Sequence, residues 1–227
     1  MREPRLYAYL DERSGPVPDY LYTVERNTHL YALKPQMLTG HMQGRFLVWL
    51  TEWLASAKTD QTQPFDVLEV GGFTGYSALC FAEALFRTST KREAPRGHVT
   101  SIEINEERES LFRQHVELAG FGESLTLHIG DANVLLDQLH ETYDLIYLDG
   151  RKADYPSQVK QCEKLLRPSG HILLDNVLWD GQVLEPDNQK ATAVMLREFT
   201  LKLARDPTWE TLMLPMRDGL MLLRQTG

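Results

Sequence analysis

The chain has 227 residues, of which 42% are hydrophobic and 25% charged, and these proportions fit one globular domain with a sizeable core. No apolar run reaches the length of a membrane-spanning helix, and the first ten residues lack the apolar centre of a signal peptide, so we expect a cytoplasmic protein. The net charge of −8 argues against nonspecific binding of nucleic acid and favours a small substrate. Cys80 and Cys162 are too few for a zinc site, and we interpret them as buried, reduced thiols.

The first sixty residues are predicted to form a helical cap joined to the rest of the chain. Short apolar stripes lie on either side of Pro16 and Pro18, which interrupt them. A stronger amphipathic helix is expected over residues 42–57, with a loop over residues 34–40 before it. The polar residues 59–64 then read as a short linker within one domain of 227 residues, whose main part begins at residue 65.

A glycine-rich turn follows the first predicted strand, residues 65–70, and leads into a predicted helix over residues 76–87. The turn contains Gly71, Gly72 and Gly75. Glycines allow the backbone to approach a ligand closely, and the first N–H groups of the helix give it a weakly positive end. Glu69 stands two residues before the first glycine, where a carboxylate would repel a pyrophosphate and attract a cation. S-adenosylmethionine, which has a sulfonium, an ammonium and no phosphate, therefore suits this turn better than a dinucleotide.

Strands and helices alternate after the turn, which predicts an α/β fold with a mostly parallel sheet covered on both faces. The expected strands are residues 98–104, 124–129, 144–149 and 171–175, and the expected helices are residues 107–119, 132–140, 156–166 and 188–204. The last two strands, residues 210–215 and 220–224, are joined by only a few residues and must pair antiparallel. The basic tract of residues 87–96 is interpreted as a solvated loop at the opposite edge of the sheet.

Polar side chains follow the predicted parallel strands at the edge where such sheets bind ligands. These residues are Glu69, Glu103, Asp131, Asp149, Asp175 and Asn176. So many carboxylates on one rim would repel one another unless cations or hydrogen-bond donors shared the site. Glu103 ends the second strand, where a carboxylate can accept hydrogen bonds from ribose hydroxyls.

A divalent cation site is predicted from Asp149, Asp175 and Asn176, which supply three oxygen ligands from neighbouring strand ends. Oxygen ligands suit magnesium, with manganese or calcium as substitutes. A cation bound there would lower the pKa of a substrate hydroxyl, and Lys152 could remove or share the hydroxyl proton. Without this neighbouring pattern, Lys152 would be interpreted equally well as a solvent-facing lysine in a loop.

Several segments resemble the cation-dependent class I O-methyltransferases of the caffeoyl-CoA and catechol O-methyltransferase group. The segments are EVGGFTGYSAL, VTSIEINEER, LAGFGESLTLHIGDA, DLIYLDGRKADY, LLRPSGHILLDNVLWDG and RDGLMLLR, and the resemblance covers nearly the whole chain. It implies a Rossmann-like, seven-stranded sheet with a reversed last strand and S-adenosylmethionine as the methyl donor. It also implies methyl transfer to one hydroxyl of a vicinal diol on an aromatic ring, as in a caffeoyl derivative, by a protein that is often a homodimer.

The resemblance assigns roles to individual positions of this sequence. The metal ligands fall on Asp149, Asp175 and Asn176, and the catalytic lysine on Lys152. The donor site falls on Met37, Thr39, Glu69, Gly71, Gly72, Ser77, Glu103, Asp131, Ala132 and Asp149. Tyr155 and Trp179 are expected to form walls on the substrate side.

The sequence departs from the family pattern at two places, and three alternatives stay open. Arg151 stands where most relatives have an acid beside the lysine, which changes the charge near the acceptor, and Gly72–Phe73 replace the commoner residues of the turn. One alternative is methylation of a hydroxylated uridine in tRNA by the same chemistry. The second is a nicotinamide-dependent dehydrogenase on a similar frame, and the third is a relative that only binds ligands.

Overall fold

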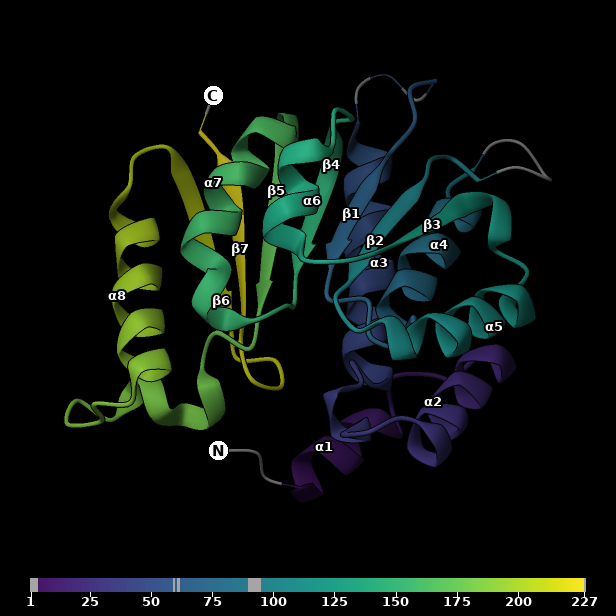
Figure 1. Cartoon of the computed structure of the whole chain (residues 1–227), viewed down its shortest axis with the longest axis horizontal. Coiled ribbons are helices and arrows are strands. Elements are labelled where there is room, and N and C mark those ends of the chain that lie inside the picture. The colour runs from purple at the N-terminus through teal and green to yellow at the C-terminus, as the bar shows by residue number, and fades with distance from the viewer. Residues whose placement is uncertain (1–3, 59, 61, 90–94, 227) are drawn as a thin grey trace.

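The fold is organised around one seven-stranded sheet with the strand order β3-β2-β1-β4-β5-β7-β6 (Figure 1). The computed structural model describes residues 4–58, 60, 62–89 and 95–226. The strands are β1 (Val67–Val70), β2 (Val99–Glu103), β3 (Leu125–Ile129), β4 (Tyr143–Leu148), β5 (Leu166–Asp175), β6 (Trp209–Leu214) and β7 (Leu220–Gln225). Strands β1 to β5 pair in parallel, whereas β7 is antiparallel to both β5 and β6. The predicted mostly parallel α/β sheet with a reversed last strand is confirmed.

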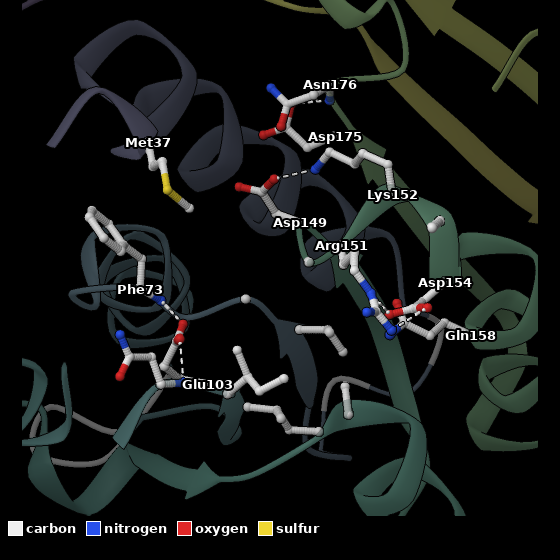
Figure 2. A pocket seen from close by; sticks show the side chains of 18 of the residues that line it. Met37, Phe73, Glu103, Asp149, Arg151, Lys152, Asp154, Gln158, Asp175 and Asn176 are labelled. Atoms are coloured by element: carbon white, nitrogen blue, oxygen red, sulfur yellow. Dashed lines mark hydrogen bonds and ion pairs between the residues drawn. The ribbon is translucent and has the colours of Figure 1, made fainter. Parts of the chain in front are cut away.

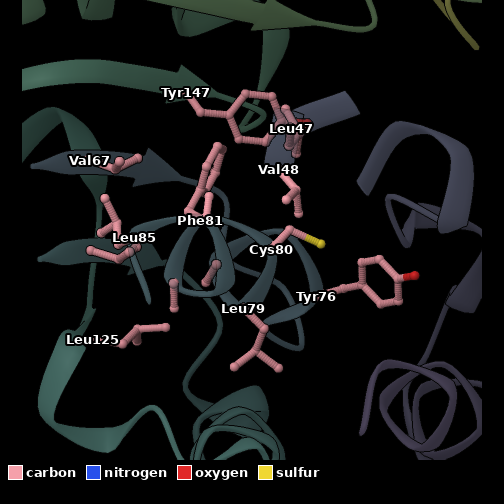
Figure 3. Close-up of a cluster of buried hydrophobic side chains, with 14 of the residues drawn as sticks. Leu47, Val48, Val67, Tyr76, Leu79, Cys80, Phe81, Leu85, Leu125 and Tyr147 are labelled. Atoms are coloured by element: carbon pink, nitrogen blue, oxygen red, sulfur yellow. The ribbon is translucent and has the colours of Figure 1, made fainter. Parts of the chain in front are cut away.

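Helices cover both faces of the sheet, which explains why the central strands β1 and β4 are buried at every residue. The helices are α3 (His41–Ala57), α4 (Tyr76–Arg87) and α5 (Glu109–Ala119) on one face, and α6 (Ala132–Gln138), α7 (Tyr155–Leu165) and α8 (Ala191–Arg205) on the other. On the first face, Leu47 of α3 and Phe81 of α4 pack near Tyr147 of β4 (Figure 3). Each face therefore has its own apolar core, and the sheet separates the two.

The N-terminal segment is only partly the cap that the sequence predicts. Helices α1 (Pro4–Asp11) and α2 (Asp19–Tyr31) lie at one end of the sheet, where α2 contacts α4 and α5. The short 3-10 helix η1 (Pro35–Met37) follows in the expected loop. Helix α3, in contrast, belongs to the layer on the sheet, because its apolar side chains pack against α4 and the strands. The position of α3 brings the start of this helix beside the ends of the strands.

Smaller differences concern the ends of elements. The helix expected to reach residue 140 ends at Gln138, and β5 starts at Leu166, five residues before the expected start at residue 171. The helix expected over residues 107–119 is split into the 3-10 helix η2 (Glu106–Arg108) and α5. Three other 3-10 helices are η3 (Gly122–Ser124), η4 (Lys152–Asp154) and η5 (Trp179–Leu184).

Two further expectations can be compared with the structure. Cys80 and Cys162 are buried and free, as predicted. Among the described residues, no helix has the length and apolar character needed to cross a membrane. In the basic tract, Arg87 pairs with Glu52 at 2.8 Å and with Glu83 at 3.3 Å, and residues 90–94 lie outside the described residues.

Candidate active site

A cavity of about 930 Å³ opens at the carboxyl ends of the parallel strands, where the sequence places its polar residues. Ten of the residues predicted for the site line this cavity: Met37, Gly71, Glu103, Asp131, Ala132, Asp149, Lys152, Asp175, Asn176 and Trp179. Figure 2 shows Asp149, Lys152, Asp175 and Asn176 grouped at one end, while Glu103 lies apart from them near Phe73. The cavity therefore has a carboxylate–lysine end and a second end around Glu103.

Lys152 is a buried cation that faces Asp149. Its side chain is 7% exposed, and its Nζ donates to Asp149 Oδ1 at 2.8 Å and to the Tyr155 hydroxyl at 2.9 Å. Burial by itself would lower the pKa of Lys152, but the attraction of Asp149 and other nearby acidic groups outweighs it and raises that pKa. The side chain is therefore a protonated ammonium in this arrangement, and the interpretation of Lys152 as a solvent-facing lysine is wrong.

Asp149 and Asp175 differ in how the protein surrounds them. The pKa of Asp149 is raised to about 6, chiefly by burial and also by the charge of Asp175, while Lys152 acts in the opposite direction. Asp175 is held by Tyr147, whose hydroxyl donates to Oδ2 at 2.5 Å, and by Gln43, whose Nε2 donates to the same oxygen at 2.6 Å. The backbone N–H of Asn176 donates to Asp175 Oδ1 at 2.6 Å. The orientation of the Asp175 carboxylate is thus fixed from both sides.

At the other end of the cavity, Glu103 at the end of β2 accepts hydrogen bonds from two loops and forms an ion pair. Its Oε2 accepts from the backbone N–H of Phe73 at 2.8 Å, and its Oε1 accepts from the backbone N–H of Asn105 at 2.9 Å. Arg108 adds an ion pair to Oε1 at 3.1 Å and lies over the Phe73 ring, 4.5 Å from its centre. Asp131 caps helix α6 by accepting from the backbone N–H of Asn133 at 2.8 Å. These contacts link the strand ends to the glycine-rich turn.

The glycine-rich turn is closely packed, and its glycines are required by space and conformation. Gly71 has φ +101°, and a Cβ atom there would lie 2.6 Å from the carbonyl oxygen of Asp149. A Cβ atom on Gly72 would lie 2.9 Å from the Phe112 ring. No larger residue fits at either glycine without moving backbone or a buried ring.

Five residues predicted for the site are buried and do not line the cavity: Thr39, Glu69, Gly72, Ser77 and Tyr155. Glu69 is fully buried, its Oε2 accepts from Ser101 Oγ at 2.5 Å, and its Oε1 has no hydrogen-bond partner. Burial raises the pKa of Glu69 to about 7, against the hydrogen bond from Ser101, which lowers it. An unpartnered buried carboxylate oxygen beneath the glycine turn is suited to a cationic group of a ligand.

The prediction that Tyr155 forms a wall of the substrate site is wrong. Its side chain is fully buried, and its hydroxyl lies 2.7 Å from the carbonyl oxygen of Leu148 and 2.8 Å from that of Asp175. Because it also accepts from Lys152, Tyr155 supports the lysine from behind the cavity. Trp179, the other expected wall residue, does line the cavity.

Several residues at the site had no role in the sequence analysis. Gln43 and Tyr147 hold Asp175 from the core side, and Phe73, Arg108 and Arg217 line the cavity. Gln43 lies outside every segment that carries the family resemblance, whereas the other four residues lie within these segments, Phe73 in the glycine turn itself. Arg151, which was noted as a departure, is exposed and makes a two-pronged ion pair with Asp154 at 2.7 and 2.9 Å, turned away from Lys152 (Figure 2).

Comparison with known proteins identifies the class. A sequence model described as O-methyltransferase matches residues 11–226. Caffeoyl-CoA O-methyltransferase 2 of Eucalyptus globulus is 29% identical over 99% of this chain and 96% of its own length. Caffeoyl-CoA O-methyltransferase 5 of Nicotiana tabacum is 31% identical over 83% of this chain and 77% of its own. The chain belongs to the O-methyltransferase family, and the predicted class, an S-adenosylmethionine-dependent O-methyltransferase, is confirmed.

Solved structures agree with this assignment at the level of the fold. A Podospora anserina methyltransferase bound to S-adenosylhomocysteine (SAH) superposes with a TM-score of 0.84 at 25% identity, covering 98% of this chain and 94% of that one. An O-methyltransferase of Bacillus cereus, also in complex with SAH, has a TM-score of 0.83 at 23% identity, covering 98% of this chain and 97% of that chain. A nicotinamide-dependent dehydrogenase, one of the open alternatives, is outside this family.

Proposed function

We propose that the protein transfers a methyl group from S-adenosylmethionine to one hydroxyl of a vicinal diol on an aromatic ring, with the help of a divalent cation. The observation that carries this proposal is the grouping of Asp149, Asp175, Asn176 and Lys152 at one end of a cavity. A catechol-type substrate such as a caffeoyl derivative presents two adjacent oxygens to such an end. The caffeoyl-CoA O-methyltransferases to which the chain is similar support the same choice.

The donor is assigned to the half of the cavity between Met37, the glycine turn and Glu103. The unpartnered Oε1 of Glu69 suits the ammonium of the donor, and Glu103 suits its ribose hydroxyls. Met37 projects its side chain into the cavity opposite Phe73 (Figure 2). Asp131 and Ala132 then lie beside the adenine, with Thr39, Gly72 and Ser77 supporting the site from behind.

The cation is assigned to Asp149, Asp175 and Asn176. Two carboxylates and an amide form an oxygen-only set that fits magnesium, and no cluster of three or more His, Cys, Asp or Glu offers a rival site among the described residues. A divalent cation held there would lower the pKa of an acceptor hydroxyl and offset the charge of Asp149. The hydrogen bonds from Gln43 and Tyr147 keep Asp175 in place for that role.

Lys152 is assigned to the acceptor's proton. Its Nζ is buried between Asp149 and Tyr155, and the raised pKa keeps it protonated while Asp149 is its main counter-charge. Lys152 can take a proton only where another group balances the charge of Asp149. The residue would therefore act as a base only when the divalent cation is bound. The remaining contribution of the chain is to align the two reactants and exclude water, for which effective molarities of order 10⁵ to 10⁸ M set the scale.

The proposal also includes a homodimer, as the resemblance implies, and a place in the cytoplasm, as the sequence without a membrane-length or signal-peptide segment suggests. Multi-angle light scattering at micromolar concentration tests the dimer, and a monomeric mass at all concentrations would contradict it.

The central experiment measures transfer of a labelled methyl group to a panel of acceptors. The panel contains catechol, caffeate, caffeoyl-CoA, a matched monohydroxy compound and tRNA, each with magnesium, with manganese and with EDTA. We expect transfer to the vicinal diols alone, loss of activity with EDTA and recovery with either metal. Full activity in chelated enzyme would exclude the metal, and a labelled nucleoside from tRNA with unlabelled diols would establish the uridine alternative instead.

A further inference from the structure

The turn between β6 and β7 holds both sides of the cavity mouth. The turn closes with a hydrogen bond from Gly219 N–H to the carbonyl of Met216 at 2.8 Å. In this turn the backbone carbonyl of Asp218 accepts from the N–H of Leu178 at 2.8 Å. The Asp218 side chain accepts from the N–H of Asp180 at 2.6 Å. The segment that carries Trp179 is therefore attached to this turn.

Arg217, in the same turn, reaches the opposite side of the mouth. Its Nη2 donates to the carbonyl of Leu38 at 2.9 Å, and its Nη1 donates to the carbonyl of Thr39. These two carbonyls directly follow Met37, whose side chain projects into the cavity (Figure 2). A planar guanidinium donates to two adjacent carbonyls from two nitrogens in a fixed geometry, whereas an ammonium must reach both from a single nitrogen on a flexible chain. The backbone after Met37 is thus fixed by a residue 178 or 179 positions away in sequence.

The same guanidinium is connected to Asp175 through Gln43. Arg217 Nη1 lies 3.5 Å from Gln43 Oε1, while Gln43 Nε2 donates to Asp175 Oδ2 at 2.6 Å and to the Tyr147 hydroxyl at 3.0 Å. Gln43 is fully buried, so its amide has no water to replace these partners. The amide oxygen of Gln43 faces the guanidinium of Arg217, and its amide nitrogen faces the carboxylate of Asp175. These two contacts fix the orientation of the Gln43 side chain.

We infer that Arg217 is a positioning residue for both reactants: it fixes the Leu38–Thr39 backbone behind Met37 at the donor half of the cavity and, through Gln43, orients the Asp175 carboxylate at the acceptor half. This inference rests on the proposed function for the identity of the two halves. The contacts with Leu38, Thr39 and Gln43 belong to the chain itself and do not depend on it. Because one guanidinium contacts both the Leu38–Thr39 backbone and Gln43, its loss affects the donor half and the acceptor half together.

The test compares Arg217→Ala, Arg217→Lys and Gln43→Met with Arg224→Ala as a matched control. Arg224 lies on β7 of the same hairpin and makes an exposed ion pair with Glu210. The first measurement is the dissociation constant of SAH by titration calorimetry. We expect it to rise about tenfold or more in Arg217→Ala, less in Arg217→Lys, and less than about twofold in Gln43→Met and Arg224→Ala.

The second measurement is hydrogen exchange of the amides of residues 38–43 in the ligand-free protein, and the third is the dissociation constant of Mn²⁺. Exchange should become faster in this segment of Arg217→Ala and stay unchanged in Arg224→Ala. Gln43→Met should weaken Mn²⁺ binding and lower kcat while the KM for the donor stays near that of the wild type. This division between KM and kcat would not follow from a general loss of stability.

Two results would overturn the inference. In one, Arg217→Ala binds SAH and exchanges residues 38–43 as the wild type does. In the other, exchange rises equally along the whole chain and Arg217→Lys is no better than Arg217→Ala, so that Arg217 only stabilises the fold. If the wild type itself bound neither SAH nor Mn²⁺, the proposed function would fail, and the exchange of residues 38–43 would alone decide whether Arg217 holds them.

Discussion

Replacement of Glu103 by Gln removes one charge from the donor half of the cavity with little change in volume. Three donors already contact the carboxylate: the backbone N–H groups of Phe73 and Asn105 and the guanidinium of Arg108. A carboxylate offers about four lone-pair positions, so one position is left for a ribose hydroxyl. A hydrogen bond to a charged group contributes about 1.5–3 kcal/mol, which corresponds to a rise of about tenfold to a hundredfold in the dissociation constant of SAH.

The assay for Glu103→Gln is titration calorimetry with SAH, together with a thermal unfolding curve. The new amide group must face either the N–H of Phe73 or that of Asn105, so one N–H loses its acceptor and the free energy of unfolding falls by about 1–3 kcal/mol. Glu106→Gln is the control, because Glu106 is an exposed neighbour in η2. A folded Glu103→Gln protein whose SAH dissociation constant lies within twofold of the wild type would refute the assignment of Glu103 to the ribose.

Three further changes test other parts of the site. Lys152→Ala should lower kcat by about 10²- to 10³-fold with SAH binding nearly intact, and part of the rate should return as pH rises. If this variant had the kcat of the wild type at neutral pH, Lys152 would be excluded as the general base. SAH should bind more tightly as pH rises through about 7, because Glu69 has a pKa of about 7 and only its ionised form attracts the ammonium. Glu69→Gln should abolish this pH dependence. The prediction would be contradicted if the affinity of the wild type for SAH did not change between pH 6 and pH 8. Arg151→Asp should change the free energy of unfolding by about 1 kcal/mol or less, because the Arg151 side chain is 72% exposed. The same variant should have a lower kcat/KM for anionic acceptors relative to neutral ones. If the ratio of the two kcat/KM values did not change, Arg151 would have no role in acceptor selection.

The fold and the acids that line the cavity could be predicted because both depend on local patterns. Apolar runs followed by helical periodicity identified the strands and helices, and the carboxyl ends of parallel strands lie on one edge by geometry. Acids at these ends, such as Glu103 and Asp149, were therefore expected in one place, and both line the cavity. The resemblance added Met37 and Trp179, which no periodicity would have selected.

The rest of the site depends on contacts between segments that are distant in sequence. Gln43 looks like one polar residue in an amphipathic helix until α3 is placed beside β5, where its amide meets Asp175. Tyr155 was expected at the substrate from the family resemblance alone, but the first turn of α7 directs it into the core. Sequence spacing gives the neighbours of a residue along the chain, and the direction of its side chain follows only from the packed structure.

Repulsion among the acids of the rim was expected to require cations or hydrogen-bond donors at the site, and the structure supplies both from the chain itself. Each carboxylate has hydrogen-bond donors or cations of its own, from Ser101 at Glu69, Arg108 at Glu103, Asn133 at Asp131, Lys152 at Asp149, and Gln43 with Tyr147 at Asp175. These donors and cations offset part of the repulsion within the protein, so repulsion by itself does not require a metal. The argument for a divalent cation is the kind of oxygen atoms gathered beside a buried lysine. Because Lys152 is protonated while Asp149 is its main partner, a methyl acceptor that binds without a cation should retain its proton, and chelation should lower kcat far more than it changes SAH affinity.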